Sequence, residues 1–344
     1  MKKLSLIFSF STLTFFSFAQ QNINYKSSIP KFDLAKEYFQ KEQYNLAYPL
    51  LKELQQSLKE TDRINHTIEA QEIDYYTIVA ALMQSENRAE LDAKQYIAIT
   101  KNNARVQMMN FHLAEYYFTR QQFSEAADLY EAADIANLNN REIADMKFHL
   151  GYSYFTLKQF AKAKPLFNTI RQLKDDPNYI DANYYYGFLA FRDKNYNEAL
   201  QAFRVVENEP AYEATVPYYI AQIYYVQGKK EEAIKYAESR LQQGKAKYYD
   251  LELKQLLGHA YFEKKQFDKG ISYYKKSIAY SLKIDAIDQV YFTNVNIAWA
   301  YFDVGKFKEG YPYLKFVGNN IEKYGDESTE IVVNMLNGMY SSFK

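Results

Sequence analysis

A pattern of apolar and small residues recurs along the chain and predicts repeated helical hairpins. Each copy has an apolar residue followed by Ala or Gly, and in most copies an aromatic residue stands three positions later. From Ala114 to Ala298 these first small residues stand 34 to 40 positions apart. They are Ala35, Ala114, Gly151, Gly187, Ala221, Gly258 and Ala298. A repeat of this length predicts an all-α solenoid in which each hairpin packs on its neighbours.

A second small residue follows in every copy, and it predicts where the two helices of a hairpin cross. These residues are Ala47, Ala126, Ala163, Ala199, Ala233, Gly270 and Gly310. Two helices approach closely only where neither carries a bulky side chain, so the two small residues of a copy should meet. A large residue stands four positions after the second small residue in six copies, and we expect it to pack against the next repeat. These large residues are Leu51, Tyr130, Phe167, Phe203, Tyr274 and Leu314, whereas Ala237 takes this place in the copy of Ala221.

A degenerate copy fits between the first two clear ones. It starts at Val79-Ala80, carries Asp92 where Ala is expected, with Ala93 beside it, and has Tyr96 and Ile99 in the later positions. Turn residues agree with the repeat, because Gly228 and Gly305 fall where first helices must end and Gly there adopts the left-handed cap conformation. Lys158-Gln159 and Lys194-Asn195 take the same place in other copies. Residues 31–317 are therefore predicted to form about eight repeats, with 64–100 degenerate, and 318–344 a capping helix or an incomplete repeat.

The repeat resembles the tetratricopeptide repeat (TPR) over residues 31–317. The resemblance implies a right-handed superhelix whose first helices line a concave surface that binds proteins or peptides. Three strings, YYYGFLAFRDKNYNEALQAF, VPYYIAQIYYVQGKKEEAI and LLGHAYFEKKQFDKGISYY, are similar to the amino-terminal part of long secreted TPR proteins of Bacteroidetes-type bacteria. That similarity is best over residues 105–275. It implies an exported scaffold of the cell envelope, and it implies no catalytic residues.

The first residues predict export. Residues 1–19 read as a cleavable signal peptide, with Lys2 and Lys3 before an apolar stretch and Ser17-Phe18-Ala19 as the cleavage site. Residues 20–30 are polar and are expected to form a flexible leader. The chain has no cysteine, which excludes a disulfide framework, a thiolate metal site and the lipid-modified cysteine of a lipoprotein. We therefore predict a periplasmic protein without a transmembrane segment after signal removal.

Charge and motifs give no support for nucleic-acid binding or for catalysis. Basic and acidic residues balance at 42 each, so no basic surface for nucleic acid is indicated. The histidines are His66, His112, His149 and His259, and no two have the i, i+4 spacing of a helical zinc site. His112 and His149 share one position of the repeat, which favours a structural role. A phosphate loop and a nucleophile motif are both missing. We expect neither an enzyme nor a cofactor.

Aromatic residues form the strongest candidate site. The chain has 35 Tyr, 24 Phe and one Trp, and many stand three before, one after or four after the first small residue. These three positions share one stripe of the first helix. The best-populated part predicts a partner-binding groove of Phe111, Phe118, Phe148, Tyr152, Phe155, Tyr184, Phe188, Phe191, Tyr218 and Tyr225. The alternative is that these rings only fill the space between neighbouring first helices.

Three function hypotheses follow from these features. The first is an exported TPR scaffold that holds a protein or peptide partner of the cell envelope in the aromatic groove. The second is a ligand- or peptide-sensing module of a signalling system, which requires an enclosed pocket. The third is a carbohydrate or peptidoglycan binder, in which rings stack on sugars beside a carboxylate such as Asp181 near Tyr184 and Phe188. The sequence leaves the identity of the partner and the oligomeric state open.

Overall fold

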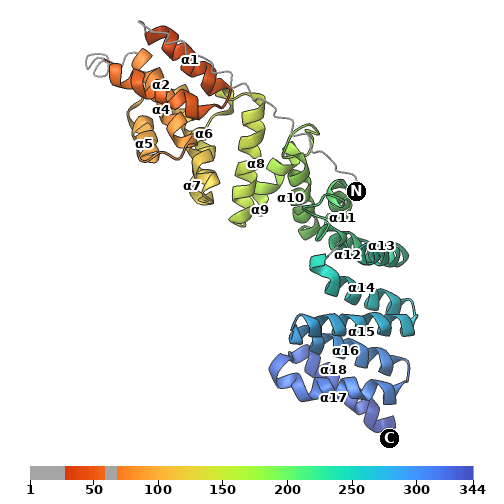
Figure 1. Ribbon diagram of the computed structural model, residues 1–344. Coiled ribbons are helices and arrows are strands. Elements are labelled where there is room, and N and C mark those ends of the chain that lie inside the picture. Colours follow the sequence, from red (N-terminus) through yellow and green to blue (C-terminus); the bar gives the residue numbers. More distant parts are fainter. Residues whose placement is uncertain (1–27, 59–67, 246, 344) are drawn as a thin grey trace, which may run out of the picture. The chain divides into compact units, whose positions relative to one another are not determined.

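The computed structural model describes residues 28–58, 68–245 and 247–343, and the regular structure in these ranges is helical throughout (Figure 1). The predicted signal peptide and most of the predicted leader lie outside the described residues. The α-helices are α1 (Ser28–Gln40), α2 (Tyr44–Ser57), α4 (Ile68–Met83), α5 (Ala89–Ile99), α6 (Asn103–Thr119), α7 (Phe123–Ala132), α8 (Asn140–Thr156), α9 (Phe160–Ile170), α10 (Tyr179–Arg192), α11 (Tyr196–Val206), α12 (Val216–Val226), α13 (Lys230–Gln242), α14 (Asp250–Glu263), α15 (Phe267–Lys283), α16 (Ile287–Asp303), α17 (Phe307–Tyr324) and α18 (Glu327–Phe343). Two short 3₁₀ helices are η1 (Ile135–Asn137) and η2 (Lys247–Tyr249). None of the described helices is both long and apolar enough to span a lipid bilayer.

The chain divides into two compact units. Unit 1 runs to Arg120 and includes residues 131–137, and unit 2 comprises residues 121–130 and 138–344. In unit 1, α1 pairs with α2 and α4 pairs with α5. In unit 2, five hairpins follow one another from α8–α9 to α16–α17, and α18 packs on α16 and α17. The predicted all-α architecture of helical hairpins is confirmed.

The degenerate copy of unit 1 is a true hairpin, but one of its expected positions is wrong. Ala80 of α4 and Ala93 of α5 are fully buried, so Ala93, and not Asp92, is the small residue of the second helix. Tyr96 is buried as well. Ile99 is 65 % exposed, because it is the last residue of α5 and the helix ends before the next repeat can cover it.

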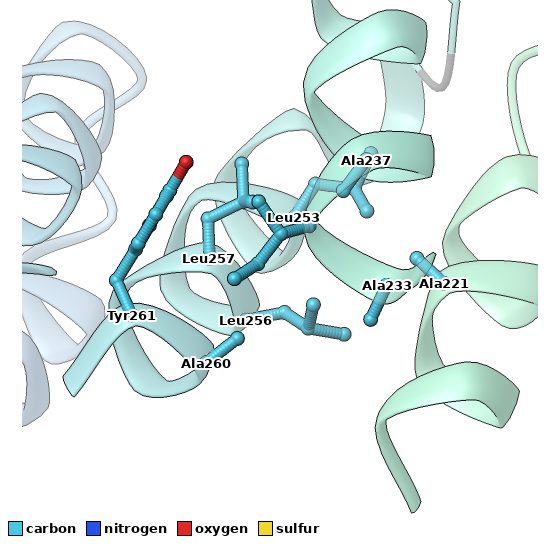
Figure 2. Packing of buried hydrophobic residues seen from close by; sticks show 9 residues of the cluster. Ala221, Ala233, Ala237, Leu253, Leu256, Leu257, Ala260 and Tyr261 are labelled. Atoms are coloured by element: carbon cyan, nitrogen blue, oxygen red, sulfur yellow. The ribbon is translucent and has the colours of Figure 1, made fainter. Parts of the chain in front are cut away.

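The small and large residues of the repeat form the core of unit 2, as the sequence predicts. The predicted large residues Tyr130, Phe167, Phe203, Tyr274 and Leu314 all have exposed fractions of 2 % or less. In the copy that carries Ala237 instead, leucines of α14 fill the space. Figure 2 shows Ala221 of α12 close to Ala233 of α13, with Leu253, Leu256 and Leu257 of α14 packed beside them.

The turns after first helices require positive φ angles, and the predicted residues supply them. Gly228 and Gly305 have φ angles of 75° and 72°. Lys158 and Lys194 occupy the same place in other hairpins, with φ angles of 60° and 62°. Glycine adopts this conformation without a steric penalty, whereas the lysines adopt it because the hairpin fixes the turn.

Gly258→Ala is expected to lower the free energy of unfolding of unit 2 by about 1 kcal/mol. A Cβ atom at residue 258 would overlap the ring of Tyr274 on α15. That ring cannot move away easily, since it is 2 % exposed and its hydroxyl lies 2.8 Å from Nδ1 of His259. Overpacking of this kind costs about 1–3 kcal/mol, which exceeds the helix-propensity gain of about 1 kcal/mol. Urea denaturation measures the change.

Gly318→Ala is the matched control for this substitution. Gly318 also lies inside a helix, α17, but a Cβ atom there meets nothing within 4 Å. Only the propensity gain remains, so this variant should be more stable than wild type by about 0.5–1 kcal/mol. Equal effects of the two substitutions would contradict the close helix crossing at Gly258.

An aromatic face on the first helices of unit 2

The predicted groove residues are divided between the two units. Phe111 and Phe118 belong to α6 of unit 1, where Phe111 is buried and its ring lies 5.2 Å from that of His112. The other eight belong to three successive first helices of unit 2. They are Phe148, Tyr152 and Phe155 on α8, Tyr184, Phe188 and Phe191 on α10, and Tyr218 and Tyr225 on α12. We call these eight rings, together with Gln222 of α12, the aromatic face.

The rings of α8 and α10 contact one another directly. Tyr185 of α10 lies between the two helices, with ring centroids 5.4 Å from Tyr152 and 4.9 Å from Phe155. The ring of Phe155 also lies 5.7 Å from that of Phe188 in an edge-to-face arrangement. Aromatic pairs in such geometries stabilise the fold beyond the area that they bury, so the two first helices are joined by rings rather than by aliphatic side chains.

The same arrangement joins α10 to α12 one repeat later. Tyr219 of α12 lies 5.9 Å from Phe188 and 5.2 Å from Phe191, measured between ring centroids. On its other side it stacks on Phe203 of α11, with the rings 5.4 Å apart and an interplanar angle of 12°. Tyr185 stacks in the same way on Phe167 of α9, at 5.2 Å and 20°. Each of the two tyrosines therefore ties two first helices to one second helix.

Sequence reasoning missed Tyr185 and Tyr219 as members of the site. Both stand two positions before the first small residue, which is the position of His112 and His149 in earlier repeats. All four side chains are planar rings, so a ring at this position was the available signal. The sequence analysis recognises this shared position only for the two histidines, and not for the two tyrosines.

Two tyrosines outside the first helices complete the face. Tyr212, which precedes α12, stacks on Tyr184 with ring centroids 4.2 Å apart. Tyr249 of η2 stacks on Tyr218 at 4.6 Å. The Tyr212 hydroxyl donates a hydrogen bond of 2.5 Å to Asp181, and the Tyr249 and Tyr219 hydroxyl oxygens lie 3.3 Å apart. The side chains of Tyr184 and Tyr218 are thus held from outside their own helices.

The phenol groups of Tyr184, Tyr212 and Tyr218 are uncharged. Burial, followed by the hydrogen bond to Asp181, raises the pKa of Tyr212, and burial raises the pKa of Tyr184 and Tyr218. These phenols therefore stay protonated at physiological pH. Phe148 is 7 % exposed and contributes mainly to packing, whereas the other seven rings are partly exposed. Partly exposed, immobilised rings are well suited to contact another molecule.

Comparisons with known proteins agree with the hairpin architecture. Two family models, both described as tetratricopeptide repeat, match residues 113–180 and 251–283. These matches cover hairpins in which the small and large positions of the repeat are buried as predicted. This is a TPR protein. No curated protein sequence matches the chain.

Several solved structures are similar to this TPR protein. RapI in its apo form is 14 % identical, with a TM-score of 0.50 over 92 % of this chain and 96 % of RapI. YrrB, a TPR protein, is 20 % identical with a TM-score of 0.42 over 53 % of this chain and 90 % of YrrB. A TPR protein from Parabacteroides merdae is 14 % identical with a TM-score of 0.38 over 77 % and 98 %. The TPR repeats identify the chain as a scaffold for protein–protein interaction. Scaffolds with this fold are generally non-catalytic.

The histidines of the TPR protein pack against tyrosines. His112 Nε2 lies 3.0 Å from the Tyr75 hydroxyl, and burial lowers the pKa of His112 to about 4. His149 Nδ1 lies 3.4 Å from the Tyr130 hydroxyl. In the ranges that the structure describes, no group of three or more His, Asp or Glu side chains is placed to hold a metal ion. His66 lies outside those ranges.

Two clefts elsewhere on the TPR repeats are lined by first and second helices together. One of ≈ 430 Å³ lies between α9 and α10, where Lys164 forms a 2.7 Å ion pair with Asp193. Another of ≈ 430 Å³ is lined by residues of α13, α14 and α15. Neither cleft is lined by a residue of the aromatic face, so the face is a surface of its own.

Proposed function

We propose that the chain is an exported, periplasmic scaffold that holds a protein or peptide partner of the cell envelope against the aromatic face of α8, α10 and α12. The observation that carries this proposal is the fixed arrangement of partly exposed rings over three successive first helices. Rings that are already immobilised lose little conformational entropy on binding, which favours affinity. Tyr and Phe also bury large areas at interfaces, and Tyr adds a polar group.

Export rests on the sequence of residues 1–19. It is supported by the charged start, the apolar stretch and the small residues before Gln20. Mass spectrometry of the tagged protein, purified from the periplasmic fraction of its own organism, measures where the mature chain begins. A mature chain that begins at Gln20 agrees with the proposal, and an intact Met1 in the cytoplasmic fraction contradicts it.

The carbohydrate alternative receives less support at the place where the sequence suggested it. The Asp181 carboxylate accepts the hydrogen bond from Tyr212, and one face of the Tyr184 ring is covered by the Tyr212 ring. A sugar there would have to displace both contacts. The aromatic face therefore favours a protein or peptide partner.

Gln222→Glu is expected to reduce partner binding at least tenfold while leaving stability unchanged. Gln222 is the non-aromatic member of the aromatic face, so its replacement removes no ring. A carboxylate there would be desolvated without a counter-charge when an uncharged partner surface binds, which costs several kcal/mol. The measurement is the amount of envelope protein retained by the tagged chain from detergent-solubilised membranes of its organism, with identification by mass spectrometry.

Gln201→Glu is the matched control, because Gln201 is exposed on the second helix α11. Both variants should unfold within about 0.5 kcal/mol of wild type, as is usual for surface substitutions. A partner that is retained equally by Gln222→Glu and wild type would contradict binding at the aromatic face. Loss of the partner in both variants would do the same.

A further inference from the structure

Four large apolar side chains lie exposed on α16 and α18 of unit 2, and we call them the Trp–Met patch. They are Phe292 and Trp299, two turns apart on α16, and Met335 and Met339, one turn apart on α18. Each is between 37 % and 43 % exposed. The two helices pack against each other, and Val295 of α16 and Val332 of α18 pack on the same buried cluster. An exposed apolar patch of this kind marks an interaction site.

Repeat geometry places both halves of the Trp–Met patch on one side of unit 2. Trp299 stands one position after Ala298, and Met339 stands one position after Gly338, which follows Ala298 by 40 residues. The helix α18 therefore has the register of a first helix. Equivalent positions of successive repeats form one surface of a solenoid, so the side chains of Trp299 and Met339 belong to the same surface.

The Trp–Met patch is separate from the aromatic face. On α14, which stands between α12 and α16 in the order of the repeats, the corresponding positions hold Gln255 and His259. Gln255 donates a hydrogen bond of 3.0 Å to the Thr293 hydroxyl of α16, and Nδ1 of His259 lies 2.8 Å from the Tyr274 hydroxyl. Polar side chains that already have partners thus interrupt the apolar stripe between the two surfaces.

The charged side chains of α16 and α18 are all acidic, namely Asp288, Asp303, Glu327 and Glu330. Asp288 stands four positions before Phe292, and Asp303 stands four positions after Trp299, so the exposed stripe of α16 begins and ends at a carboxylate. All four carboxylates are exposed, and within the described residues none forms an ion pair. Electrostatic complementarity therefore requires a partner with basic residues beside its apolar ones.

The side chains of the patch select the backbone conformation of the partner. Phe and Met offer no strong hydrogen-bonding group, and the Trp299 indole offers one N–H donor. An extended segment would bury unpaired backbone N–H and C=O groups against such a surface, which is costly. An α-helix bonds these groups internally, and flexible Met side chains adapt to the ridges of a docked helix. The patch therefore favours a helical partner.

We propose that the Trp–Met patch docks a basic amphipathic α-helix of a partner protein. The apolar stripe of that helix covers Trp299, Met335 and Met339, and lysine or arginine side chains near its two ends pair with Asp288 and Asp303. These two carboxylates stand 15 positions apart on α16, which is about 22 Å along a helix, so the docked helix has about four turns. This surface is additional to the aromatic face, and the inference does not rest on the proposed function.

Fluorescence titration tests the proposal, because Trp299 is the single tryptophan of the chain and reports on the patch without a label. The protein is titrated with a synthetic Leu–Lys peptide that forms a basic amphipathic helix of about four turns, with its Leu–Glu counterpart and with phosphatidylglycerol vesicles. The Leu–Lys peptide should shift the Trp299 emission to shorter wavelength and should bind more weakly as the salt concentration rises. The Leu–Glu peptide and the vesicles should leave the emission unchanged, because the carboxylates repel them.

Asp288→Asn and Asp303→Asn each remove one carboxylate and should each weaken binding of the Leu–Lys peptide about two- to fivefold, as for an exposed ion pair. The double variant should show about the product of the two effects. Met339→Ala leaves the charge unchanged but removes an apolar contact, and it should weaken binding about three- to tenfold. Asp128→Asn is the matched control, because Asp128 is exposed on the second helix α7, and it should bind as wild type does.

Equal or tighter binding of the Leu–Glu peptide would overturn the inference, and so would a Trp299 emission that no peptide changes. Binding of the Leu–Lys peptide that both Asp→Asn variants leave unchanged would do the same. A shift of the emission with the vesicles alone would identify the patch as a membrane contact instead. Since the titration reports on Trp299 and not on the rings of α8, α10 and α12, its failure leaves the proposed function standing.

Discussion

Phe203→Ala is expected to lower the free energy of unfolding of unit 2 by about 3–5 kcal/mol, the usual cost of truncating a buried Phe. The Phe203 ring is fully buried on α11, stacks on Tyr219 and lies against the backbone of Gly187. Its removal leaves a cavity beneath the aromatic face and takes away the support of Tyr219. Urea denaturation gives the total change, and hydrogen exchange in α10, α11 and α12 shows whether the loss is local.

Phe292→Ala is the matched control for this substitution. Phe292 lies on α16 and is 38 % exposed, so its truncation should cost less than about 1 kcal/mol. A similar loss in the two variants would show that the buried ring of Phe203 has no special role in supporting the face.

Acidification is expected to destabilise unit 1 through His112, by about 3 kcal/mol between pH 7 and pH 4. Burial lowers the pKa of His112 to about 4, from an ordinary value of about 6.5 in the unfolded chain. Between these values the unfolded state binds more protons than the folded state, so stability falls as the pH falls. Each pKa unit corresponds to about 1.4 kcal/mol. Of the charged groups nearby, Glu115 opposes this shift and Arg105 reinforces it.

His112→Gln removes this titration and isolates its contribution. Carboxylates titrate in both proteins, so the difference in unfolding free energy between wild type and variant is the quantity to measure across pH 4–7. At pH 7 wild type should be the more stable, because His112 is buried and hydrogen-bonded to Tyr75. The difference should shrink by about 3 kcal/mol on acidification. A constant difference across this range would show that His112 titrates as it does in water.

The sequence predicted those parts of the fold that depend on the repeat itself. The small residues at helix crossings and the large residues such as Phe203 follow directly from the 34–40-residue period, because each repeat packs on its neighbours in the same way. Ile99 was placed in a later position of the repeat, but it is exposed because the degenerate second helix ends at that residue. The period of the repeat does not fix where a helix ends.

The candidate site was predicted less completely, for a physical reason. The stripe of positions on one helix was found from helical geometry, but Tyr185 and Tyr219 point between helices and become part of the site only when the hairpins stack. Tyr212 and Tyr249 lie in connections between repeats, whose course the pattern of apolar residues does not determine. The ring-on-ring contacts that immobilise Tyr184 and Tyr218 therefore required the structure.

Site-specific photo-crosslinking tests the central claim most directly, namely that a partner binds at the aromatic face. A photoreactive phenylalanine is introduced at residue 222 on α12, and in a second protein at residue 201 on α11, and both are irradiated in cells of the native organism. The account predicts that position 222 cross-links to one defined envelope protein and that position 201 does not. Cross-linking at 201 with none at 222 would place the partner on the second helices and contradict the account.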